Sequence, residues 1–540
     1  MHVLSALEMQ ACDRATAETF GLSSIALMRN AARSIADFAR QQFPGARRVT
    51  VLCGRGNNGG DGMMASRLLA EPGPSGIALE VTTLLLGAPE GFDPDVVTAW
   101  GELLAHAAPG TVHVIETTAD FALYPQALQC DLLVDAVVGT GFKPPLRGLA
   151  AEALDWLQAS RAPVLSVDLP SGWAADATDP LPCGPVFPSD AVVTFTAPKP
   201  AHVFGQLTRH WNQPVVVAPI GSPDAAIVSK LSIRWAGTAM QLVRAPRAPG
   251  ANKGNFGHVL VVGGSIGRSG APSMTALAAL RSGAGLVTAA VPAPVQPLVA
   301  AVAPELMTWP LPASGSGGIS PDSLNPATLS ALMAGMSVLA IGPGLGQAPE
   351  TVKFVTGLLS ATKIPAVIDA DALNILAYKP VLLAKLAKGR TVVLTPHPGE
   401  MARLAGISVP EVQARRLEVA RGFAAQFGVT LVLKGARTVI AHPDGRLAVN
   451  TTGNPGMAKG GSGDQLTGLV AGLLVQHPAA VSRAIEAAVY LHGLAADFAV
   501  RDGDEHTLLT SDSLREFSRA FRFDSRGQNG YVWLQGLPAA

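Results

Sequence analysis

A glycine-rich segment near the C-terminus, residues 453–468, carries one carboxylate, Asp464, and leads into the apolar sequence LTGLVAGLLVQ. Glycines let the backbone turn tightly and approach a ligand closely. The sequence after Asp464 predicts a helix, whose first N–H groups and dipole would favour an anion. Phosphoryl transfer needs a general base beside the bound phosphate. The segment therefore predicts a phosphoryl-transfer site with Asp464 as the base, the alternative being a flexible glycine turn.

A second glycine-rich segment, GRGNNGGDG at 54–62, follows an apolar run that ends at Cys53. It contains the GxGxxG spacing, and Glu80 lies roughly where a dinucleotide-binding fold holds its ribose-binding acid. The core from Asn57 to Asp61 has more polar side chains than a plain Rossmann turn. Such a loop could hold a phosphate through its N–H groups and a cation through side-chain oxygens. The alternative is a structural turn with a capping aspartate.

Two more acids follow apolar runs in the first half of the chain. Asp135 precedes the sequence Gly139-Thr140-Gly141, and Asp168 begins the sequence DLPSG. In an open parallel sheet, ligands bind outside the carboxyl ends of the strands. Each acid alone could cap a helix, but three such ends with polar or glycine clusters favour one shared pocket.

The runs that position these residues indicate two α/β series. Continuous Val/Leu-rich runs separated by helical stretches are typical of a buried parallel sheet. The first series follows a helical segment at 1–43 and predicts a Rossmann-like, doubly wound sheet. Its expected strands lie at 47–53, 78–86, 131–139, 163–172 and 190–198, and those of the second series at 258–264, 285–292, 337–344, 365–373, 391–399 and 429–438.

A chain of 540 residues is too long for one ordinary core. The sequence changes character around 205–250, where a Pro/Ala/Gly-rich stretch separates the two series. We therefore predict domains at 1–222 and 223–520, followed by a tail at 521–540.

Composition excludes several classes of function. The chain has 40 basic and 40 acidic residues, so its formal net charge gives no support for binding to nucleic acid or to an anionic membrane surface. No apolar run reaches the length of a membrane span, and the N-terminus lacks the layout of a signal peptide. The four cysteines form no CxxC pair, which favours free thiols in a reducing cytoplasm.

Four short motifs of the first half occur together: NNGGD at 57–61, DAVVGTG at 135–141, VDLPSG at 167–172 and TFTAPKP at 194–200. As a set they resemble the YjeF N-terminal domain family, which includes NAD(P)H-hydrate epimerases, over roughly residues 5–215. The sequence departs from the family at Ala31-Ala32, where Ala-Gly is frequent, and we expect only a packing effect.

This resemblance implies a potassium ion bound by Asn58, Asp135 and Ser171, and it makes Asp168 the candidate acid/base. The hydrated nucleotide would be lined by Asn57, Asn58, Gly59, Gly60, Asp61, Gly139, Thr140, Gly141, Phe142, Lys143, Pro144 and Pro145.

The second half carries three motifs: IGPGLG at 341–346, TPHPGE at 395–400 and GNPGMAKGGSGD at 453–464. With the glycine-rich stretch at 253–285 they resemble the ADP-dependent NAD(P)HX dehydratase family, whose fold is ribokinase-like, over about residues 228–515. Gln465 replaces a more usual valine, and we expect this difference to cause little loss of function.

This second resemblance implies that Ala271, Gly344, His397 and Asp464 contact the hydrated dinucleotide. A lone histidine at a strand end is more often structural, but the flanking TPHPGE sequence favours a functional His397. Asp369 and Asp371 could hold Mg²⁺ or cap a helix. The adenine nucleotide would be contacted by Lys434, Gly435, Ala436, Arg437, Thr438 and Gly463.

Together the two resemblances predict a bifunctional repair enzyme for NAD(P)H hydrates. It would interconvert the R and S hydrates and use ADP to dehydrate the S epimer, giving NAD(P)H, AMP and phosphate. We also expect a cytoplasmic homo-oligomer with no nucleic-acid or membrane partner. The alternative is a vitamin-precursor kinase with a non-catalytic nucleotide-binding module in front of it.

Overall fold

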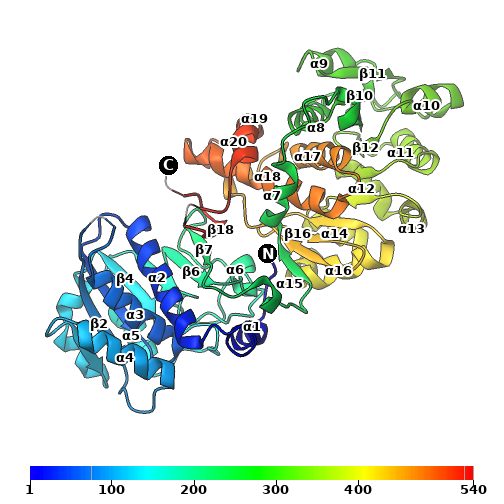
Figure 1. Cartoon of the computed structure of the whole chain (residues 1–540). Helices are drawn as coiled ribbons and strands as arrows, with labels where there is room; N and C mark the ends of the chain where they lie inside the picture. The colour runs from blue at the N-terminus through cyan, green and yellow to red at the C-terminus, as the bar shows by residue number, and fades with distance from the viewer. Residues whose placement is uncertain (75, 528, 539–540) are drawn as a thin grey trace. The chain divides into compact units, whose positions relative to one another are not determined.

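The computed structural model describes residues 1–74, 76–527 and 529–538, and these fold as two compact units (Figure 1). The first unit comprises Met1–Ser232 together with the C-terminal segment that begins at Asp524, and the second comprises Ile233–Phe523. The division between the units falls after the expected 222/223 boundary. None of the described helices has both the length and the apolar character needed to cross a bilayer.

The first unit contains an eight-stranded sheet in the order β18-β7-β6-β5-β4-β1-β2-β3. All neighbours pair in parallel except β18 and β7. Strand order reverses at β1, which lies between β2 and β4, and such a reversal opens a crevice at the carboxyl ends of the strands. The strands are β1 (Arg48–Cys53), β2 (Glu80–Leu86), β3 (Val112–Ile115), β4 (Leu132–Ala136), β5 (Val164–Val167), β6 (Ala191–Phe195), β7 (Val215–Ala218) and β18 (Val532–Gln535).

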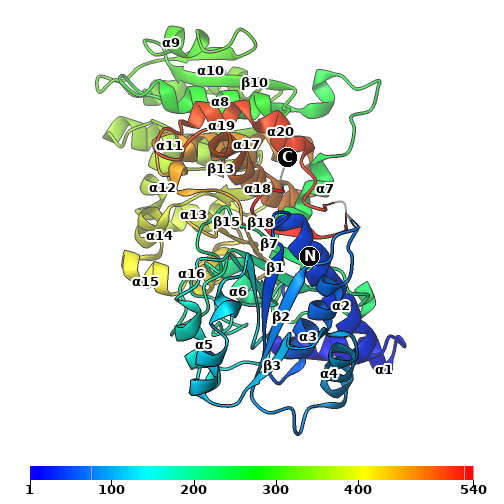
Figure 2. The ribbon, with the colours of Figure 1, turned by 90° about the vertical axis from the view of Figure 1, so that its left-hand side faces the viewer.

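Helices cover both faces of this sheet, and α2, α3 and α4 form one layer (Figure 2). Alternate residues of β1 pack against the helices on opposite faces of the sheet, because successive side chains along a strand point to opposite faces. Val49 and Val51 pack under α2–α4, whereas Leu52 packs on the α5 side. The helices are α1 (Ala6–Glu18), α2 (Ser24–Gln42), α3 (Asn57–Ala70), α4 (Pro94–His106), α5 (Leu149–Leu157) and α6 (Pro200–Phe204), with 3-10 turns at Thr118–Leu123, Pro125–Leu128 and Asp224–Ala226.

The segment expected to be a tail supplies an edge strand to the first unit. β18 pairs antiparallel with β7 (Figure 1). Phe38 of α2 makes edge contacts with Tyr531 and Trp533, at centroid distances of 5.6 and 6.2 Å, and the Tyr531 hydroxyl donates to the Ser34 carbonyl at 2.9 Å. The aromatic residues therefore complete the core of the first unit. Residues 528, 539 and 540 of the expected tail lie outside the described residues.

The second unit contains a ten-stranded sheet in the order β11-β10-β9-β12-β13-β14-β15-β16-β17-β8. It is parallel from β11 to β15, while β16 pairs antiparallel with both of its neighbours. Its strands are β8 (Ile233–Trp235), β9 (His258–Val262), β10 (Leu286–Pro292), β11 (Met307–Leu311), β12 (Val338–Ile341), β13 (Ala366–Ile368), β14 (Val392–Leu394), β15 (Thr430–Leu433), β16 (Val439–Ala441) and β17 (Leu447–Val449).

The helix predicted after Asp464 is α17 (Ser462–Gln476), and every residue from 465 to 475 in it is buried. A helix that is apolar all round is buried all round, and α17 packs between α8 and α18. The other helices are α7 (Met240–Val243), α8 (Gly270–Arg281), α9 (Gln296–Ala300), α10 (Pro326–Met333), α11 (Pro349–Ala361), α12 (Ala370–Ala377), α13 (Pro380–Leu386), α14 (Pro398–Ala405), α15 (Val409–Ala414), α16 (Arg416–Phe427), α18 (Val481–Arg501), α19 (Thr510–Arg515) and α20 (Phe517–Arg522), with 3-10 turns at Ala236–Ala239, Lys253–Phe256, Pro321–Leu324 and Pro455–Met457.

Three local expectations differ from the structure. The run at 365–373 is a strand only to Ile368, because α12 begins at Ala370. The expected loop from Asn57 to Asp61 is instead the first part of α3. Glu80 is the first residue of β2, so it lies at the end of the sheet away from the glycine-rich turn and cannot act as a ribose-binding acid there.

Candidate active sites

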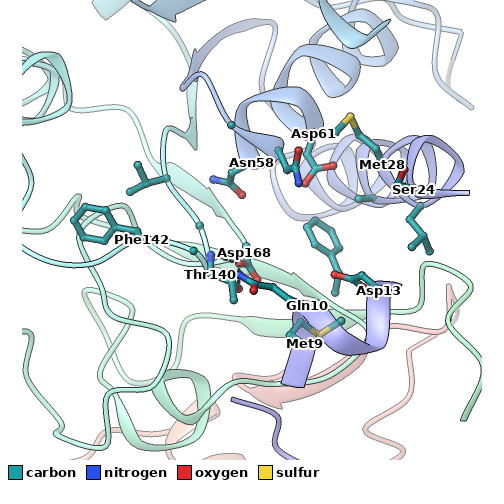
Figure 3. Close-up of a pocket in the computed structure, with 18 of the residues that line it drawn as sticks. Met9, Gln10, Asp13, Ser24, Met28, Asn58, Asp61, Thr140, Phe142 and Asp168 are labelled. Atoms are coloured by element: carbon teal, nitrogen blue, oxygen red, sulfur yellow. Dashed lines mark hydrogen bonds between the residues drawn. The ribbon is translucent and has the colours of Figure 1, made fainter. Parts of the chain in front are cut away.

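A cavity of about 620 Å³ lies in the first unit at the carboxyl ends of its strands (Figure 3). Ligand pockets of this kind typically measure about 300–1,000 Å³. Of the residues expected to bind the nucleotide, the cavity lining includes Asn57, Asn58, Asp61, Gly139, Thr140, Gly141 and Phe142. Among the described residues, Gly59, Gly60, Lys143, Pro144 and Pro145 are not part of that lining.

The glycines of the 54–62 segment allow close packing. A Cβ atom at Gly54 would lie 1.9 Å from the Val137 carbonyl oxygen, and one at Gly59 would lie 1.8 Å from the Gly54 oxygen. Backbone segments therefore meet here at distances that only glycine permits. Within the described part of the chain, α3 has no side-chain cap at its N-cap residue Gly56, so the first N–H groups of the helix can face an anion.

Asp168 is held in a charged network directly after β5. It is 6% exposed and has a φ of 64°, which is strained for a residue with a side chain. Its carboxylate accepts from Lys199 Nζ at 2.7 Å, from Thr194 Oγ1 at 2.8 Å and from the backbone N–H and hydroxyl of Thr140. Burial opposes ionisation, but the Lys199 ammonium holds the pKa of Asp168 well below its usual range. Asp168 is therefore a carboxylate at neutral pH.

Lys199 was not singled out as a site residue from the sequence, although it lies in the TFTAPKP motif. Its side chain is 2% exposed and lines the cavity. His202 lies behind it, where its Nε2 is 2.7 Å from the Asp168 carbonyl oxygen. Burial and the Lys199 charge lower the pKa of His202 to about 4, so the imidazole is neutral. Lys199 is thus the cation that balances the negative charge of the buried Asp168 carboxylate.

Two of the three expected potassium ligands lie in direct contact. Asp135 on β4 accepts from the Ser171 hydroxyl at 2.6 Å and from the Ser171 N–H at 2.8 Å. Burial raises the pKa of Asp135 to about 6, although its hydrogen bonds to Ser171 oppose the rise. The amide nitrogen of Asn58 is buried and has no hydrogen-bond partner among the described residues. The Asn58 Oδ1 atom would be 2.9 Å from a Cβ atom at Gly139. This oxygen-rich donor set with one carboxylate fits a hard cation.

Three further acids line the same cavity, Asp95 on α4 and the two that Figure 3 labels, Asp61 and Asp13. Asp61 lies on α3, and Asp13, which was not predicted as a site residue, lies on α1. Burial raises the pKa of Asp13 to about 6 and places the pKa of Asp61 well above its usual range. Asp13 could not have been found from a motif, since its helix joins the cavity only in the folded unit.

In the second unit, Asp464 occupies the first turn of α17. The preceding Gly461 adopts a φ of 93°, which favours glycine, and lets the chain enter the helix from the glycine-rich segment. Burial, with a smaller contribution from Asp369, raises the pKa of Asp464 to about 6. The carboxylate is therefore ionised at neutral pH and more basic than an exposed aspartate.

A buried ion pair lies beside Asp464. Asp369, 1% exposed at the end of β13, accepts from Lys434 Nζ at 2.9 Å and from Thr467 Oγ1 at 2.7 Å. Glu400 lies 3.9 Å from the same ammonium, and burial raises its pKa to about 7. A Cβ atom at Gly463 would be 3.2 Å from Lys434 Nζ. Lys434 therefore brings a positive charge to the N-terminus of α17.

His397 is the N-cap residue of α14. Its Nδ1 accepts from Gly399 N–H at 3.0 Å, while Glu400 accepts from the His397 N–H at 2.8 Å. This reciprocal arrangement is a capping box. Because Nδ1 accepts, the proton of the neutral ring is on Nε2, and that side chain is about half exposed, at 51%. Burial, followed by the Lys434 charge, lowers the pKa of His397. The ring therefore combines a structural role with a partly exposed Nε2, which lies 3.6 Å from Glu400 Oε1.

The other expected contacts lie in two places. Gly344, with a φ of 68°, packs against Ala271, so the structure brings these two together. Lys434 to Thr438 connect β15 to β16, and Thr438 Oγ1 closes that turn onto the Gly435 oxygen at 2.9 Å. Burial lowers the pKa of Arg437 to about 10, and its guanidinium donates to the Thr451 carbonyl.

Asp369 and Asp371, which were expected either to hold Mg²⁺ or to cap a helix, contact different partners. Asp369 is committed to Lys434 and Thr467, whereas Asp371 accepts from Gly346 N–H at 2.8 Å and from Gln347 Nε2 at 3.1 Å. Asp371 therefore holds the IGPGLG turn, and binding of Mg²⁺ by this pair stays a prediction.

The fold and the two sites define a two-unit α/β protein in which each unit holds buried carboxyl groups, one of them in the first turn of α17. Known families match both units: "YjeF-related protein N-terminus" at residues 24–201 and "NAD(P)H-hydrate dehydratase" at residues 259–517. A bifunctional NAD(P)H-hydrate repair enzyme of Moorella thermoacetica is 41% identical over 95% of this chain and 95% of that protein. Its Escherichia coli counterpart is 36% identical over 92% and 90%.

The chain belongs to the family of bifunctional NAD(P)H-hydrate repair enzymes. The predicted functions, epimerisation of NAD(P)H hydrates and their ADP-dependent dehydration, are confirmed at the level of the family, as is the predicted fold class. Among solved structures, an ADP/ATP-dependent NAD(P)H-hydrate dehydratase from Bacillus subtilis, co-crystallised with ATP/Mg²⁺, is 35% identical. The match covers 52% of this chain and 96% of the Bacillus subtilis protein, with a TM-score of 0.44.

Proposed function

We propose that Asp464 is the general base of dehydration and that the cavity of the first unit is the epimerase site. The observation that carries the first assignment is the position of Asp464 in the first turn of α17, beside the Lys434–Asp369 pair. A nicotinamide ring hydrated at C6 cannot readily lose hydroxide, which is a poor leaving group. The enzyme must first convert the hydroxyl into a better one.

The proposed reaction has two steps. Asp464 takes the hydroxyl proton as the C6 oxygen attacks the β-phosphate of ADP, so that AMP leaves and the ring carries a phosphate. The ring nitrogen then pushes phosphate out, and the resulting cationic ring loses a proton from C5 to form the C5=C6 double bond of NAD(P)H. A base works best when its pKa lies near the working pH, and the pKa of about 6 given by burial suits Asp464 to this role.

We assign charge stabilisation to Lys434 and to the N–H groups of α17. As phosphate is transferred, negative charge grows on its oxygens, and preorganised donors at a helix N-terminus offset it. Lys434 Nζ lies close to Gly463 in that first turn. The nucleotide contacts expected for Lys434, Gly435, Ala436, Arg437, Thr438 and Gly463 remain predictions, as do the hydrate contacts of Ala271, Gly344 and His397. Mg²⁺ would come with the nucleotide phosphates.

In the first unit we propose that Asp168 accepts protons, since Lys199 keeps it ionised. Asn58, Asp135 and Ser171 would hold potassium, whose positive charge would offset the burial of the Asp135 carboxylate and orient the bound nucleotide phosphates. Interconversion of the epimers would replenish the S form that dehydration consumes. The cytoplasmic location, supported by four cysteines that form no disulfide, and the homo-oligomer also remain predictions.

One experiment tests the dehydratase assignment. The full chain is mixed with the S epimer of NADHX and either ADP or ATP, and recovery of the reduced-nicotinamide absorbance is followed together with release of inorganic phosphate. Asp464→Asn should lower turnover by about 10²–10⁴-fold, the usual contribution of a general base. Asp512→Asn on α19, which removes a carboxylate elsewhere in the unit, is the matched control. Unchanged turnover in Asp464→Asn would reject the base role, and a stable phosphoester product would indicate a kinase.

A further inference from the structure

The α1 helix brings to the epimerase cavity a carboxyl group that no motif indicates. Met9, Gln10 and Asp13 all line the cavity, because residues three and four apart lie on one face of a helix. Met9 and Cys12 pack against Ala197 and Ala226, which fixes the helix. Oδ1 of Asp13 is buried and has no hydrogen-bond partner among the described residues. Figure 3 shows its side chain beside Gln10, on a different element from Asp168.

The acids of this cavity differ in how their charge is compensated. Asp168 receives Lys199 Nζ at 2.7 Å and three further donors. Asp13 has no ion pair among the described residues, and Lys199 reaches it only as a weaker, longer-range influence. The titratable and charged groups that face Asp13 across the cavity are Asp61 on α3, Asp95 on α4, Arg55 before α3, Asp168 after β5 and Lys199 before α6.

This difference separates the pKa values of the two carboxyl groups. Burial raises the pKa of Asp13 to about 6, whereas Lys199 holds the pKa of Asp168 well below its usual value despite burial. When neighbouring titratable groups have pKa values pushed apart, the group with the higher pKa is suited to act as the acid and the other as the base. Asp13 keeps a useful protonated fraction near neutral pH, and Asp168 does not.

Epimerisation at C6 needs one group of each kind. The C6–O bond must break and re-form on the opposite face of the ring. Departure is easier when an acid donates a proton, so that the hydroxyl leaves as water while the ring-nitrogen lone pair forms a C=N⁺ bond. A water molecule must then add to the other face and lose a proton to a base. Two carboxyl groups on different elements can serve the two faces.

We propose that Asp13 is a second catalytic residue of the epimerase, which protonates the departing C6 hydroxyl while Asp168 accepts the proton of the water that adds to the opposite face. The proposal rests on the epimerase role assigned above to this cavity. Asp61 keeps its assignment to substrate binding.

The proton count balances over one turnover. Asp13 gives up one proton, one water molecule leaves, one water molecule adds, and Asp168 gains one proton. An oxygen that bonds to a cationic carbon becomes strongly acidic, so even a weakly basic carboxylate such as Asp168 can accept from it. Protonated Asp168 is then a strong acid and returns the proton through water to ionised Asp13. Running in the opposite direction, the two residues exchange roles, as microscopic reversibility requires.

The test follows epimerisation of the separated R hydrate of NADHX by the full chain without ADP, so that dehydration does not consume the product. Asp13→Asn should lower kcat by about 10²–10⁴-fold, the range for one general acid, with a smaller change in KM. Asp13→Glu, which keeps a carboxyl group, should recover part of the rate. Glu18→Gln, at the exposed end of the same helix, is the matched control and should keep the wild-type rate.

The pH profile separates catalysis from a merely structural role. In the wild type, kcat should fall as pH rises through about 6, because Asp13 loses the proton that it must donate, and Asp13→Asn should lack this limb. Wild-type kcat in Asp13→Asn would overturn the proposal. If that variant does not fold, a wild-type kcat that stays constant between about pH 5 and 8 overturns it instead. An inactive wild-type chain would refute the epimerase assignment itself.

Discussion

Replacing Lys434 with methionine removes a cation that contacts both Asp369 and Glu400 in the second unit. Its Nζ lies 2.9 Å from Asp369 Oδ1 and 3.9 Å from Glu400 Oε2, and the two carboxylate side chains are 2% and 6% exposed. Removing one partner of a buried pair leaves an uncompensated charge and costs about 3–5 kcal/mol. We therefore expect Lys434→Met to destabilise the second unit by about that amount.

The same change alters catalysis in a predictable direction. The Lys434 ammonium lowers the pKa of Asp464 against the effect of burial, so its removal raises that pKa further. Dehydration requires ionised Asp464. The pH at which the rate rises should therefore be higher in the variant than in the wild type. At neutral pH the variant should also be slower because the transferred phosphate loses a nearby positive charge.

A double-mutant cycle measures the pairing. Urea unfolding of the full chain is followed by loss of ADP-dependent dehydration, with Lys434→Met, Asp369→Asn and the double variant compared. Residues in direct contact give non-additive effects, so the double variant should lose less stability than the sum of the two single variants. Additive losses within about 0.5 kcal/mol, or a Lys434→Met variant as stable as the wild type, would refute the inferred pairing.

Three other results are expected. In the wild type, dehydration should increase as pH rises through about 6, where Asp464 ionises, and a rate independent of pH between about 5 and 8 would contradict its role as base. Asp168→Ala should abolish epimerisation, measured on separated hydrates, and leave dehydration of the S form intact, whereas loss of both activities would point to damage to the fold. Trp533→Ala should destabilise the first unit by about 3–5 kcal/mol in thermal unfolding, since Trp533 is 4% exposed against Phe38. An unchanged midpoint would show that β18 does not support this core.

Local patterns in the sequence predicted many of the strands and helices of the fold. The Val/Leu-rich runs predicted β1, β2, β4, β5 and β6, and the apolar sequence after Asp464 predicted α17. Most residues of these elements are buried, so their sequences contain apolar runs that are easily recognised. The sequence prediction did not include β3, of four residues, or β16 and β17, of three residues each.

The sequence by itself determined which chemistry is available: Asp464 at the start of an apolar helix, Asp168 at the end of a strand, and the glycines that admit a ligand. Only the tertiary structure decided how those groups are charged. Lys199 lies 31 residues from Asp168 and Lys434 lies 65 residues from Asp369, yet each pair is in contact. Asp13 reaches the cavity through the packing of α1, and β18 joins β7 from the far end of the chain. The pKa of a carboxyl group depends on burial and on neighbouring charges, and both are set by contacts between distant segments that no local pattern records.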